Sequence, residues 1–190
     1  MKILAFGTSN NRRSINRTLA TYAAQLVEGA TVEVLGIADY EMPIFSDERE
    51  QALGQPPQAK AFFQKIAEAD ALVISFTEHN GSYTAAWKNL FDWTSRIDTK
   101  VFQGKPALFL ATSPGPGGAA NVLAAAVNSA PYFGANVISS LSVHSFHENF
   151  DEEAGHISHR GIQRRLRRAT RMLGNKVSRA LQLADTDIAV

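Results

Sequence analysis

The sequence predicts a doubly wound α/β domain in which a five-stranded parallel sheet is covered by helices on both faces. Short apolar runs alternate along the chain with segments whose apolar residues recur at helical spacing. Two of the runs, Asp70–Phe76 and Pro106–Thr112, are almost continuously apolar, which is typical of strands buried on both faces of a parallel sheet. A chain of 190 residues is long enough for one such domain with a proper core.

Each element follows from its own local pattern. The predicted strands, in chain order, are Lys2–Gly7, Thr31–Ile37, Asp70–Phe76, Pro106–Thr112 and Ala135–Ser139. The helix after the first strand is indicated by an apolar stripe made of Leu19, Tyr22, Ala23, Leu26 and Val27. The later helices are expected at Gln58–Glu68, Thr84–Arg96, Asn121–Pro131 and Gly161–Ala184.

Three segments between these elements are expected to be irregular. Proline and glycine interrupt Ala38–Pro57, Thr77–Tyr83 is a polar loop, and Ser113–Gly118 (SPGPGG) cannot form regular structure. The domain is expected to span residues 1–184, with a frayed tail at Asp185–Val190. Five strands in a chain of this size favour the flavodoxin-like order 2-1-3-4-5. In that order a ligand lies beyond the carboxyl ends of the strands, at the switch point between the first and third strands.

The segment between the first strand and the first helix has the composition of an anion site. Its polar and cationic side chains are Thr8, Ser9, Asn10, Asn11, Arg12, Arg13, Ser14 and Asn16. A loop that opens onto a helix gathers N–H donors and the positive end of the helix dipole. Neither G-x-G-x-x-G nor a Walker sequence is present, so a mononucleotide phosphate fits better than a pyrophosphate. Helix capping explains Ser14 and Asn16 equally well.

The three unusual loops follow the first, third and fourth strands. They read TSNNRRSIN, TEHNGSY and SPGPGG, and this fold brings all three to one edge of the sheet. The first is an anion site, the second is polar, and the third is a glycine-rich turn that allows close approach of backbone to a flat ligand. Phosphate, polyol and ring system are the parts of flavin mononucleotide (FMN).

Composition excludes several classes of function. The net charge of +1 gives no field toward nucleic acid or a membrane, and the absence of cysteine excludes disulfides and thiolate catalysis. The chain enters a strand at once, so no signal peptide is expected and the location is expected to be cytoplasmic. No metal is expected, because the histidines (His144, His147, His156 and His159) form no helical H-x-x-x-H pair. The basic run Arg164–Arg171 is expected to be a solvated helix face.

The three loops and their flanks resemble the NAD(P)H-dependent FMN reductase family, which has a flavodoxin-like fold and includes bacterial quinone, azo-dye and chromate reductases. The matching segments are GTSNNRRSIN, EHNGSYTAAWKNLFDW and SPGPGG, in the right order and spacing across roughly Met1 to Phe150. The middle segment is the most specific, because the family typically reads P-E-Y-N-G-S-x-x-x-x-x-K-N-x-x-D-W. The positions that agree with that pattern are Glu78, Asn80, Gly81, Ser82, Lys88, Asn89, Asp92 and Trp93.

The resemblance implies a role for each site residue. The flavin phosphate would be bound by Ser9, Asn11, Ser14 and Asn16, the amide of Ile15, and the charge of Arg12 or Arg13. The ribityl chain and isoalloxazine would lie beside Glu78, His79, Asn80 and Gly81. The pyrimidine edge of the ring would lie along Ser113, Gly115 and Gly118. No side chain is expected to act as a catalytic acid or base.

Two departures from the family pattern leave questions open. Thr77-Glu78-His79 stands where the family usually has Pro-Glu-Tyr, so His79 could stack on the flavin, contact a partner subunit, titrate, or play no part in turnover. Gly7-Thr8-Ser9 replaces the common Gly-Ser, which leaves the register of the phosphate loop open by one residue.

The activity implied by the resemblance is ping-pong hydride transfer. NAD(P)H would reduce bound FMN and leave, and a quinone, azo compound, free flavin or other small acceptor would then take two electrons. A homodimer or homotetramer is expected, and the aromatic residues Trp87, Phe91 and Trp93 are assigned to the core or a subunit contact. The alternatives are a flavodoxin-like electron carrier, a supplier of reduced FMN to a monooxygenase, and a flavin-binding regulatory module.

Overall fold

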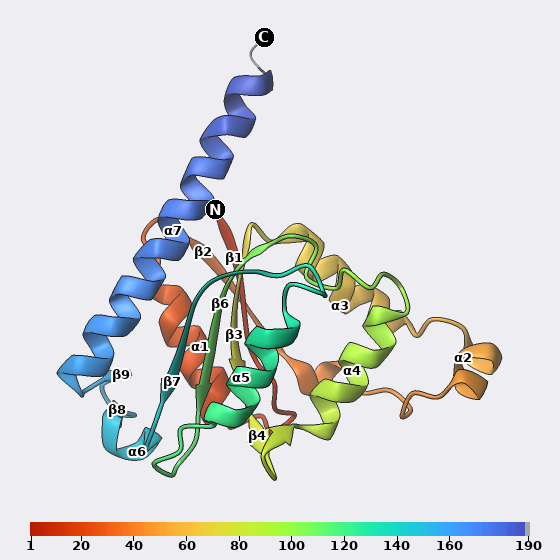
Figure 1. The fold of residues 1–190 in the computed structure, drawn as a ribbon, viewed down its shortest axis with the longest axis horizontal. Helices are drawn as coiled ribbons and strands as arrows, with labels where there is room; N and C mark the ends of the chain where they lie inside the picture. The colour runs from red at the N-terminus through yellow and green to blue at the C-terminus, as the bar shows by residue number, and fades with distance from the viewer. Residues whose placement is uncertain (189–190) are drawn as a thin grey trace.

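The chain folds around a parallel sheet with strand order β2-β1-β3-β6-β7 (Figure 1). This computed structural model describes the backbone of residues 1–188 and the side chains of residues 1–183. The strands are β1 (Lys2–Gly7), β2 (Thr31–Gly36), β3 (Ala71–Phe76), β6 (Pro106–Thr112) and β7 (Asn136–Val143). Taken in chain order they are the first to fifth parallel strands, so the predicted order 2-1-3-4-5 is confirmed.

Helices cover both faces of the sheet, as predicted. The first face carries α1 (Ile15–Gln25) and α7 (Arg160–Ile188). The second carries α3 (Pro57–Glu68), α4 (Ala85–Ser95) and α5 (Ala120–Ser129) (Figure 1).

Successive residues of β1 show why the sheet needs both layers. Ile3 and Ala5 pack under α1 and α7, whereas Leu4 and Phe6 pack under the other three helices, and all four are fully buried. The pattern is therefore an unbroken apolar run instead of an alternation.

Aromatic rings fill the layer under α3, α4 and α5. Phe76 contacts Phe109 with ring centroids 4.9 Å apart, and Phe6 meets Phe62 at 5.5 Å. Trp87 and Trp93 are 2% and 0% exposed, so the assignment of these two residues to the core is confirmed. Complete burial of each such side chain contributes roughly 1.5–3 kcal/mol.

Several short elements lie in segments that were expected to be irregular. Within Ala38–Pro57 the chain forms the 3₁₀ helix η1 (Ile37–Tyr40) and α2 (Asp47–Leu53). Helix α2 buries no residue, so it has no apolar stripe by which periodicity would reveal it. The expected polar loop Thr77–Tyr83 contains a hairpin of β4 (Glu78–His79) and β5 (Ser82–Tyr83).

The end of the chain also differs from expectation. Strand β7 extends to Val143, past the expected end at Ser139, and is followed by α6 (Phe146–Asn149) and the hairpin of β8 (Phe150–Asp151) and β9 (His156–Ile157). Helix α7 continues to Ile188, so the predicted tail is helical over its first four residues, and its last two lie outside the described part. The second half of α7 extends beyond the end of the sheet (Figure 1).

The basic run on α7 faces solvent, as predicted. Its exposed arginines are Arg164, Arg165, Arg167, Arg168 and Arg171. The opposite stripe is buried and comprises Ile162, Leu166, Ala169, Leu173 and Val177. Within the described residues, no helix is both long and apolar enough to cross a membrane.

Candidate functional site

The loops after β1, β3 and β6 are joined by hydrogen bonds at the carboxyl edge of the sheet. Thr8, which follows β1, donates its N–H to Ser75 O (3.0 Å) and accepts from Thr77 N at its hydroxyl (2.8 Å). Thr84 Oγ1 donates to Thr8 O (2.6 Å) and also caps α4 by accepting from Trp87 N (3.1 Å). Thr8 and Thr84 are 0% and 1% exposed. These two buried hydroxyls fix the first loop to the second.

Asn16 ties α1 to the middle of the sheet. Its amide oxygen accepts from Ser75 Oγ (2.7 Å) and Thr112 N (3.0 Å), and its amide nitrogen donates to Thr112 O (3.0 Å). The residue is 2% exposed. The side chain therefore bridges β3 and β6, and its hydrogen-bonding atoms are already used within the protein.

The first loop holds its own shape through short polar contacts. Ser9 Oγ accepts from Asn11 N (3.1 Å), and Asn11 Oδ1 accepts from Arg13 N (2.9 Å). Ser14 is the N-cap of α1 and accepts from Arg17 N (3.3 Å), so the capping explanation holds for Ser14.

The first turn of α1 presents free donors. Among the described residues no hydrogen bond is found for the N–H groups of Ile15 and Asn16. Two free N–H groups at the positive end of a helix form an anion-binding position.

Gly7 allows α1 to start so close to β1. A Cβ at this position would stand 2.4 Å from Arg17 N and 2.8 Å from Asn16 C. Both are backbone atoms, so the helix start would have to move. A glycine at the end of β1 is therefore required for the position of the free N–H groups.

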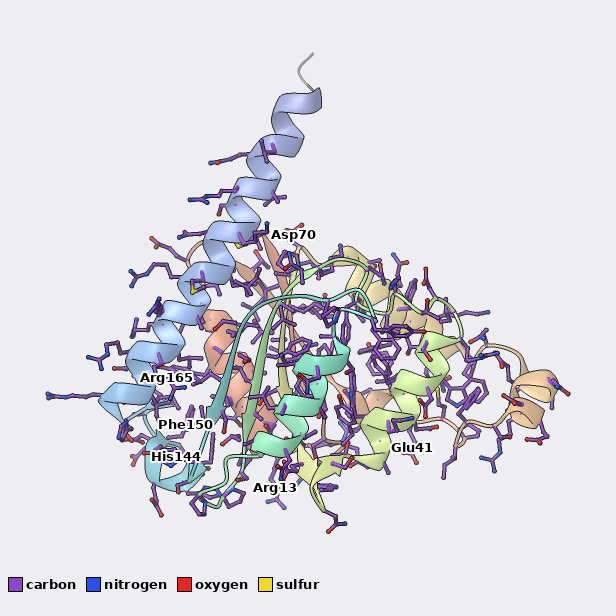
Figure 2. All side chains as sticks on the ribbon, in the orientation of Figure 1. Arg13, Glu41, Asp70, His144, Phe150 and Arg165 are labelled. Carbon is purple, nitrogen blue, oxygen red and sulfur yellow. The ribbon has the colours of Figure 1, made fainter. Side chains whose placement is uncertain are left out.

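The cationic side chains of the first loop are exposed. Arg12 Nη2 lies 3.2 Å from Asp39 Oδ1, with side-chain exposures of 79% and 60%. An ion pair this exposed is weak and can exchange for an anion. Arg13 lies at the same end of the molecule as the β4–β5 hairpin (Figure 2).

The second loop is a tight hairpin that reaches across to the third. Asn80 and Gly81 have φ of 52° and 80°, as a two-residue Asn-Gly turn requires. Glu78 Oε2 accepts from Val122 N at 2.9 Å, so this carboxylate caps the first turn of α5. His79, Asn80 and Gly81 are exposed at the tip.

The third loop is held against α6 and β7. Ser113 O accepts from Phe146 N (3.0 Å) and Gly115 O from Ser145 N (2.9 Å), while Ser113 Oγ donates to Gly115 O (3.2 Å). Gly118 has φ of 58°, and a Cβ there would stand 2.3 Å from Ser142 Oγ. A Cβ on Gly115 would meet nothing within 4 Å. Gly118 is thus required by packing, whereas Gly115 borders open space.

A cavity of about 260 Å³ adjoins the first loop, between η1, residues 41–44 and α4. Its wall is held by Asn89, which accepts from Phe45 N (2.8 Å) and donates to Met42 O (3.0 Å). Trp93 Nε1 donates to Pro43 O (2.7 Å). The family pattern had pointed to Asn89 and Trp93. Nothing in the sequence would place Met42 or Tyr40 at this cavity, where the Tyr40 ring packs on Phe62.

Three of the four histidines that were considered as metal ligands, His144, His147 and His159, have contacts within their own segments. His147 Nδ1 lies 2.6 Å from Glu152 Oε1, and His159 Nδ1 accepts from Ile162 N (3.3 Å) at the start of α7. Asn149 Nδ2 donates to His144 O (2.9 Å), which fixes the turn after β7. Among the described residues no group of three potential metal ligands is found.

The chain was compared with protein-family models, with the sequences of known proteins and with solved structures, and all three comparisons match it to flavin reductases. The family model for NADPH-dependent FMN reductase matches residues 1–148. An NAD(P)H-dependent FMN reductase of Pseudomonas aeruginosa is 35% identical over 121 residues, 63% of this chain and 64% of that protein. An NADPH:quinone oxidoreductase of Arabidopsis thaliana is 33% identical over 122 residues, 62% of this chain and 61% of that protein. The matches thus span less than two thirds of these relatives.

The fold is shared more completely than the sequence. The structure of FerB, a flavoenzyme NAD(P)H:(acceptor) oxidoreductase from Paracoccus denitrificans, superposes with a TM-score of 0.76 at 24% identity, covering 94% of this chain and 97% of that one. The family match covers all three loops of the carboxyl edge. The chain therefore belongs to the NADPH-dependent FMN reductase family.

Proposed function

We propose that this protein is an FMN-dependent NAD(P)H oxidoreductase that passes two electrons to a quinone-like, azo or other small acceptor, or to free flavin. The observation that carries the proposal is the pair of free N–H groups of Ile15 and Asn16 at the start of α1. Hydrogen bonds hold the loop before this helix start to the loop after β3, and hold the loop after β3 to α5, which follows the third loop. Family membership supports the cofactor, and the two relatives named as FMN and quinone reductases support the acceptor class.

The first loop would hold the flavin phosphate. Ser9, Asn11 and Ser14 would contribute side-chain donors, Ile15 its N–H, and Arg12 a charge that exchanges its contact with Asp39 for the phosphate. Asn16 would act through its N–H and by anchoring the loop, since its amide oxygen already accepts two protein hydrogen bonds.

The other two loops would hold the rest of the cofactor. Glu78, His79, Asn80 and Gly81 would border the ribityl chain and ring, with Glu78 joining the hairpin to α5. Ser113, Gly115 and Gly118 would line the pyrimidine edge, where Gly115 leaves room for close approach. Bound FMN would supply reversible two-electron chemistry. The residues themselves bind, orient and shield the ring, and a ping-pong order in which both substrates use one face needs no acid–base pair.

A first experiment tests cofactor and turnover together. The purified protein is expected to show a flavin absorption spectrum that bleaches on anaerobic addition of NADPH and returns on addition of a quinone. A protein that stays colourless after soaking in FMN would refute the proposal. A flavin that binds but is not turned over would instead support the carrier or regulatory alternative.

A matched pair of variants tests the phosphate position. Ile15→Pro removes one N–H at the first helical position, where proline is favoured, and Ile15→Ala controls for the lost side chain. Relative to Ile15→Ala, the proline variant is expected to bind FMN about tenfold more weakly, because a hydrogen bond to a charged acceptor contributes about 1.5 kcal/mol. Riboflavin lacks the phosphate, so its affinity is expected to be the same in both variants.

We also propose that the protein is a homodimer or homotetramer that uses the surface around α4 and α5. A cavity of about 190 Å³ opens there, lined mainly by aromatic residues that include Tyr83, Phe91 and Phe133. Burial raises the pKa of Tyr83 above its ordinary value. Neighbouring Tyr132 is 68% exposed. Light scattering coupled to size exclusion measures the mass, and a monomer would exclude this part of the proposal.

A further inference from the structure

Strand β7 forms an edge of the sheet that no further strand covers among the described residues. It pairs with β6 on one side and lies between α7 and α5 (Figure 1). Its first part contains a bulge between Val137 and Ser139, whereas residues 139–143 pair regularly with β6. Alternate N–H and C=O groups of an edge strand point away from its neighbour. Residues 139–143 therefore offer unpaired backbone groups to an added strand.

The two edges of the sheet are not protected alike. The other edge strand, β2, carries Glu33, which forms ion pairs with Lys2 (2.9 Å) and Lys65 (2.7 Å). Charged side chains are one of the means by which proteins prevent pairing at a free edge. Strand β7 is eight residues long and has neither a charged residue nor a proline. The edge formed by β7 is thus the one open to pairing.

A hollow of about 310 Å³ borders this edge on the face of α7. Ser139 and Leu141 of β7 line it, together with Arg165, Arg168 and Met172 of α7. Both arginines are exposed, and Met172 is 43% exposed. This side of the edge therefore combines two cationic groups with strand backbone (Figure 2).

A second hollow, of about 340 Å³, borders the same edge on the face of α5. Ser140 lines it from β7, and its other walls are mainly the apolar side chains of Ala120, Leu123, Ala124 and Val127. None of these residues lines the aromatic cavity proposed as a subunit contact. Side chains of a strand alternate between the two faces of a sheet. An added strand would therefore place charged and small apolar side chains alternately over the two hollows.

The charges around the edge are all of one sign. Residues 160–184 of α7 contain seven arginines and one lysine and no acidic residue, and neither β7 nor α5 contains one. No ion pair is found for Arg165 or Arg168 within the part of the chain whose side chains are described. Since the whole chain has a net charge of only +1, this side is cationic on a molecule that is otherwise acidic. Charge complementarity calls for an acidic partner.

We propose that residues 139–143 bind an extended acidic segment of another protein, which adds a strand to the sheet. Its carboxylates pair with Arg165 and Arg168, and its alternate small apolar side chains lie over the hollow beside α5. In such a complex the main-chain hydrogen bonds supply affinity and the alternating side chains supply selectivity. This surface goes beyond the proposed reductase activity and shares no residue with the three flavin loops.

Two other occupants fit less well. Antiparallel pairing of β7 with the same strand of a second copy would place both α7 helices on one face, so that like charges would face each other across the new edge. A nucleic acid would use the arginines but would leave the backbone groups of β7 unpaired. The acidic strand satisfies both the charges and the backbone.

The direct test measures binding of short labelled peptides to the full chain by fluorescence anisotropy. A peptide of alternating valine and glutamate is expected to bind, and a valine–lysine peptide of the same length is not. A third peptide keeps every glutamate but has proline at its central valine, which removes an N–H and interrupts pairing. It is expected to bind about tenfold more weakly than the first. Equal binding of the proline peptide would overturn the added strand.

A matched pair of double variants tests the charges. Arg165→Gln combined with Arg168→Gln is expected to weaken the glutamate peptide about tenfold. Arg164→Gln combined with Arg167→Gln removes the same charge from exposed positions of α7 outside the hollow, and is expected to have little effect. Because all four side chains are exposed, both proteins are expected to melt at the wild-type temperature. Equal weakening in the two proteins would show that affinity follows overall charge, which would overturn the proposal.

Hydrogen exchange locates the contact and identifies the occupant. The amides of residues 139–143 that point away from β6 are expected to exchange quickly in the free protein and slowly with the glutamate peptide bound. If they already exchange slowly in the free protein, the edge is covered by the protein itself or by a second copy, and the proposal fails. It also fails if an oligothymidylate binds as tightly as the glutamate peptide.

Discussion

At the scale of single residues, Asn16 shows how one buried polar group can hold a ligand site in place. Its side chain makes three hydrogen bonds of 2.7–3.0 Å to β3 and β6. Asn16→Ala would leave Ser75 Oγ and both backbone groups of Thr112 unpaired. We expect a loss of about 2–4 kcal/mol in the free energy of unfolding, measured by urea titration. Asn175→Ala makes the same change on the exposed face of α7 and is expected to cost nothing. Equal stabilities of the two variants would show that the Asn16 contacts are not stabilising.

The close contact of Gly7 with the start of α1 leads to a second stability prediction, on steric grounds. Gly7→Ala is expected to lower the free energy of unfolding by about 3 kcal/mol and to weaken FMN binding, because the new methyl group meets backbone atoms of Asn16 and Arg17. Gly117→Ala, in the third loop, meets nothing within 4 Å and serves as the control. Denaturant titration and flavin fluorescence together check both parts. A Gly7→Ala protein as stable as the control would mean that α1 can shift without cost.

At the scale of elements, Glu78 connects a hairpin to a helix that has no cap of its own. The N-cap residue of α5, Ala119, has φ of 57° and offers no side-chain hydrogen bond. The Glu78 carboxylate caps the helix in its place by accepting from Val122 N. Glu78→Ala is expected to cost about 1 kcal/mol and to speed hydrogen exchange at Val122 N. Glu41→Ala, an exposed carboxylate elsewhere, should leave that amide protected. Unchanged exchange at Val122 in Glu78→Ala would contradict the capping role.

On the edge strand β2, Glu33 forms ion pairs that join this strand to β1 and α3. Its carboxylate accepts from Lys65 Nζ (2.7 Å) and Lys2 Nζ (2.9 Å), and these hydrogen bonds, that from Lys65 first, lower the pKa of Glu33. A lowered folded-state pKa stabilises the protein above the unfolded-state value of about 4.3, and the contribution disappears as pH falls through the folded-state value.

This linkage predicts how a charge-removing variant depends on pH. Glu33→Gln is expected to lower stability by less than about 1 kcal/mol at pH 7, because the pairs are partly exposed, and by progressively less below pH about 4. Thermal melts between pH 3 and 8 measure the difference. Glu28→Gln, exposed between α1 and β2, is the control. A Glu33→Gln deficit that persisted undiminished at pH 3 would mean that packing, and not charge, is responsible.

At the scale of the whole molecule, the sequence was informative wherever burial imposes a pattern. The five parallel strands were predicted from their apolar residues, and their order from the number of strands in a chain of this size. The signal is clearest in β3, where every residue is buried and Ser75 is the single polar side chain. Helix α2 buries no residue, and the two strands of the β8–β9 hairpin are only two residues long, so neither leaves a periodic signal. Strand β7, an edge strand, ran longer than predicted because the four residues beyond the predicted end include two serines, Ser140 and Ser142, which interrupt the apolar run.

The candidate site, too, could be predicted only in part. Loop composition and family pattern identified the three loops, but they could not tell which polar residues face a ligand and which hold the loops together. Asn16 was assigned to the phosphate, yet its side chain lies among β3 and β6. The contact by which Thr84 joins the second loop to Thr8 in the first could not be predicted, because a single hydroxyl beside an apolar run has no distinctive spacing. Partnering across the sheet is visible only in three dimensions.

The long last helix supplies a prediction about the molecule as a whole. Among the residues whose side chains are described, Val177 is the last one buried on α7, and beyond it Leu181 and Leu183 are 38% and 67% exposed. The helix beyond Val177 extends past the sheet (Figure 1). Ending the chain after Arg179 is therefore expected to change the free energy of unfolding by less than about 1 kcal/mol and to leave FMN affinity unchanged, as measured by urea titration and flavin fluorescence.

A second truncation provides the contrast. Ending the chain after Thr170 also removes Leu173 and Val177, which are 0% and 2% exposed and pack against the layer of α1. Losing two buried aliphatic side chains is expected to cost at least about 4 kcal/mol, since each large-to-small change in a core costs roughly 2–5 kcal/mol. If the shorter deletion were as damaging as the longer one, the projecting turns of α7 would have to contact another part of the folded protein, or a second copy of it.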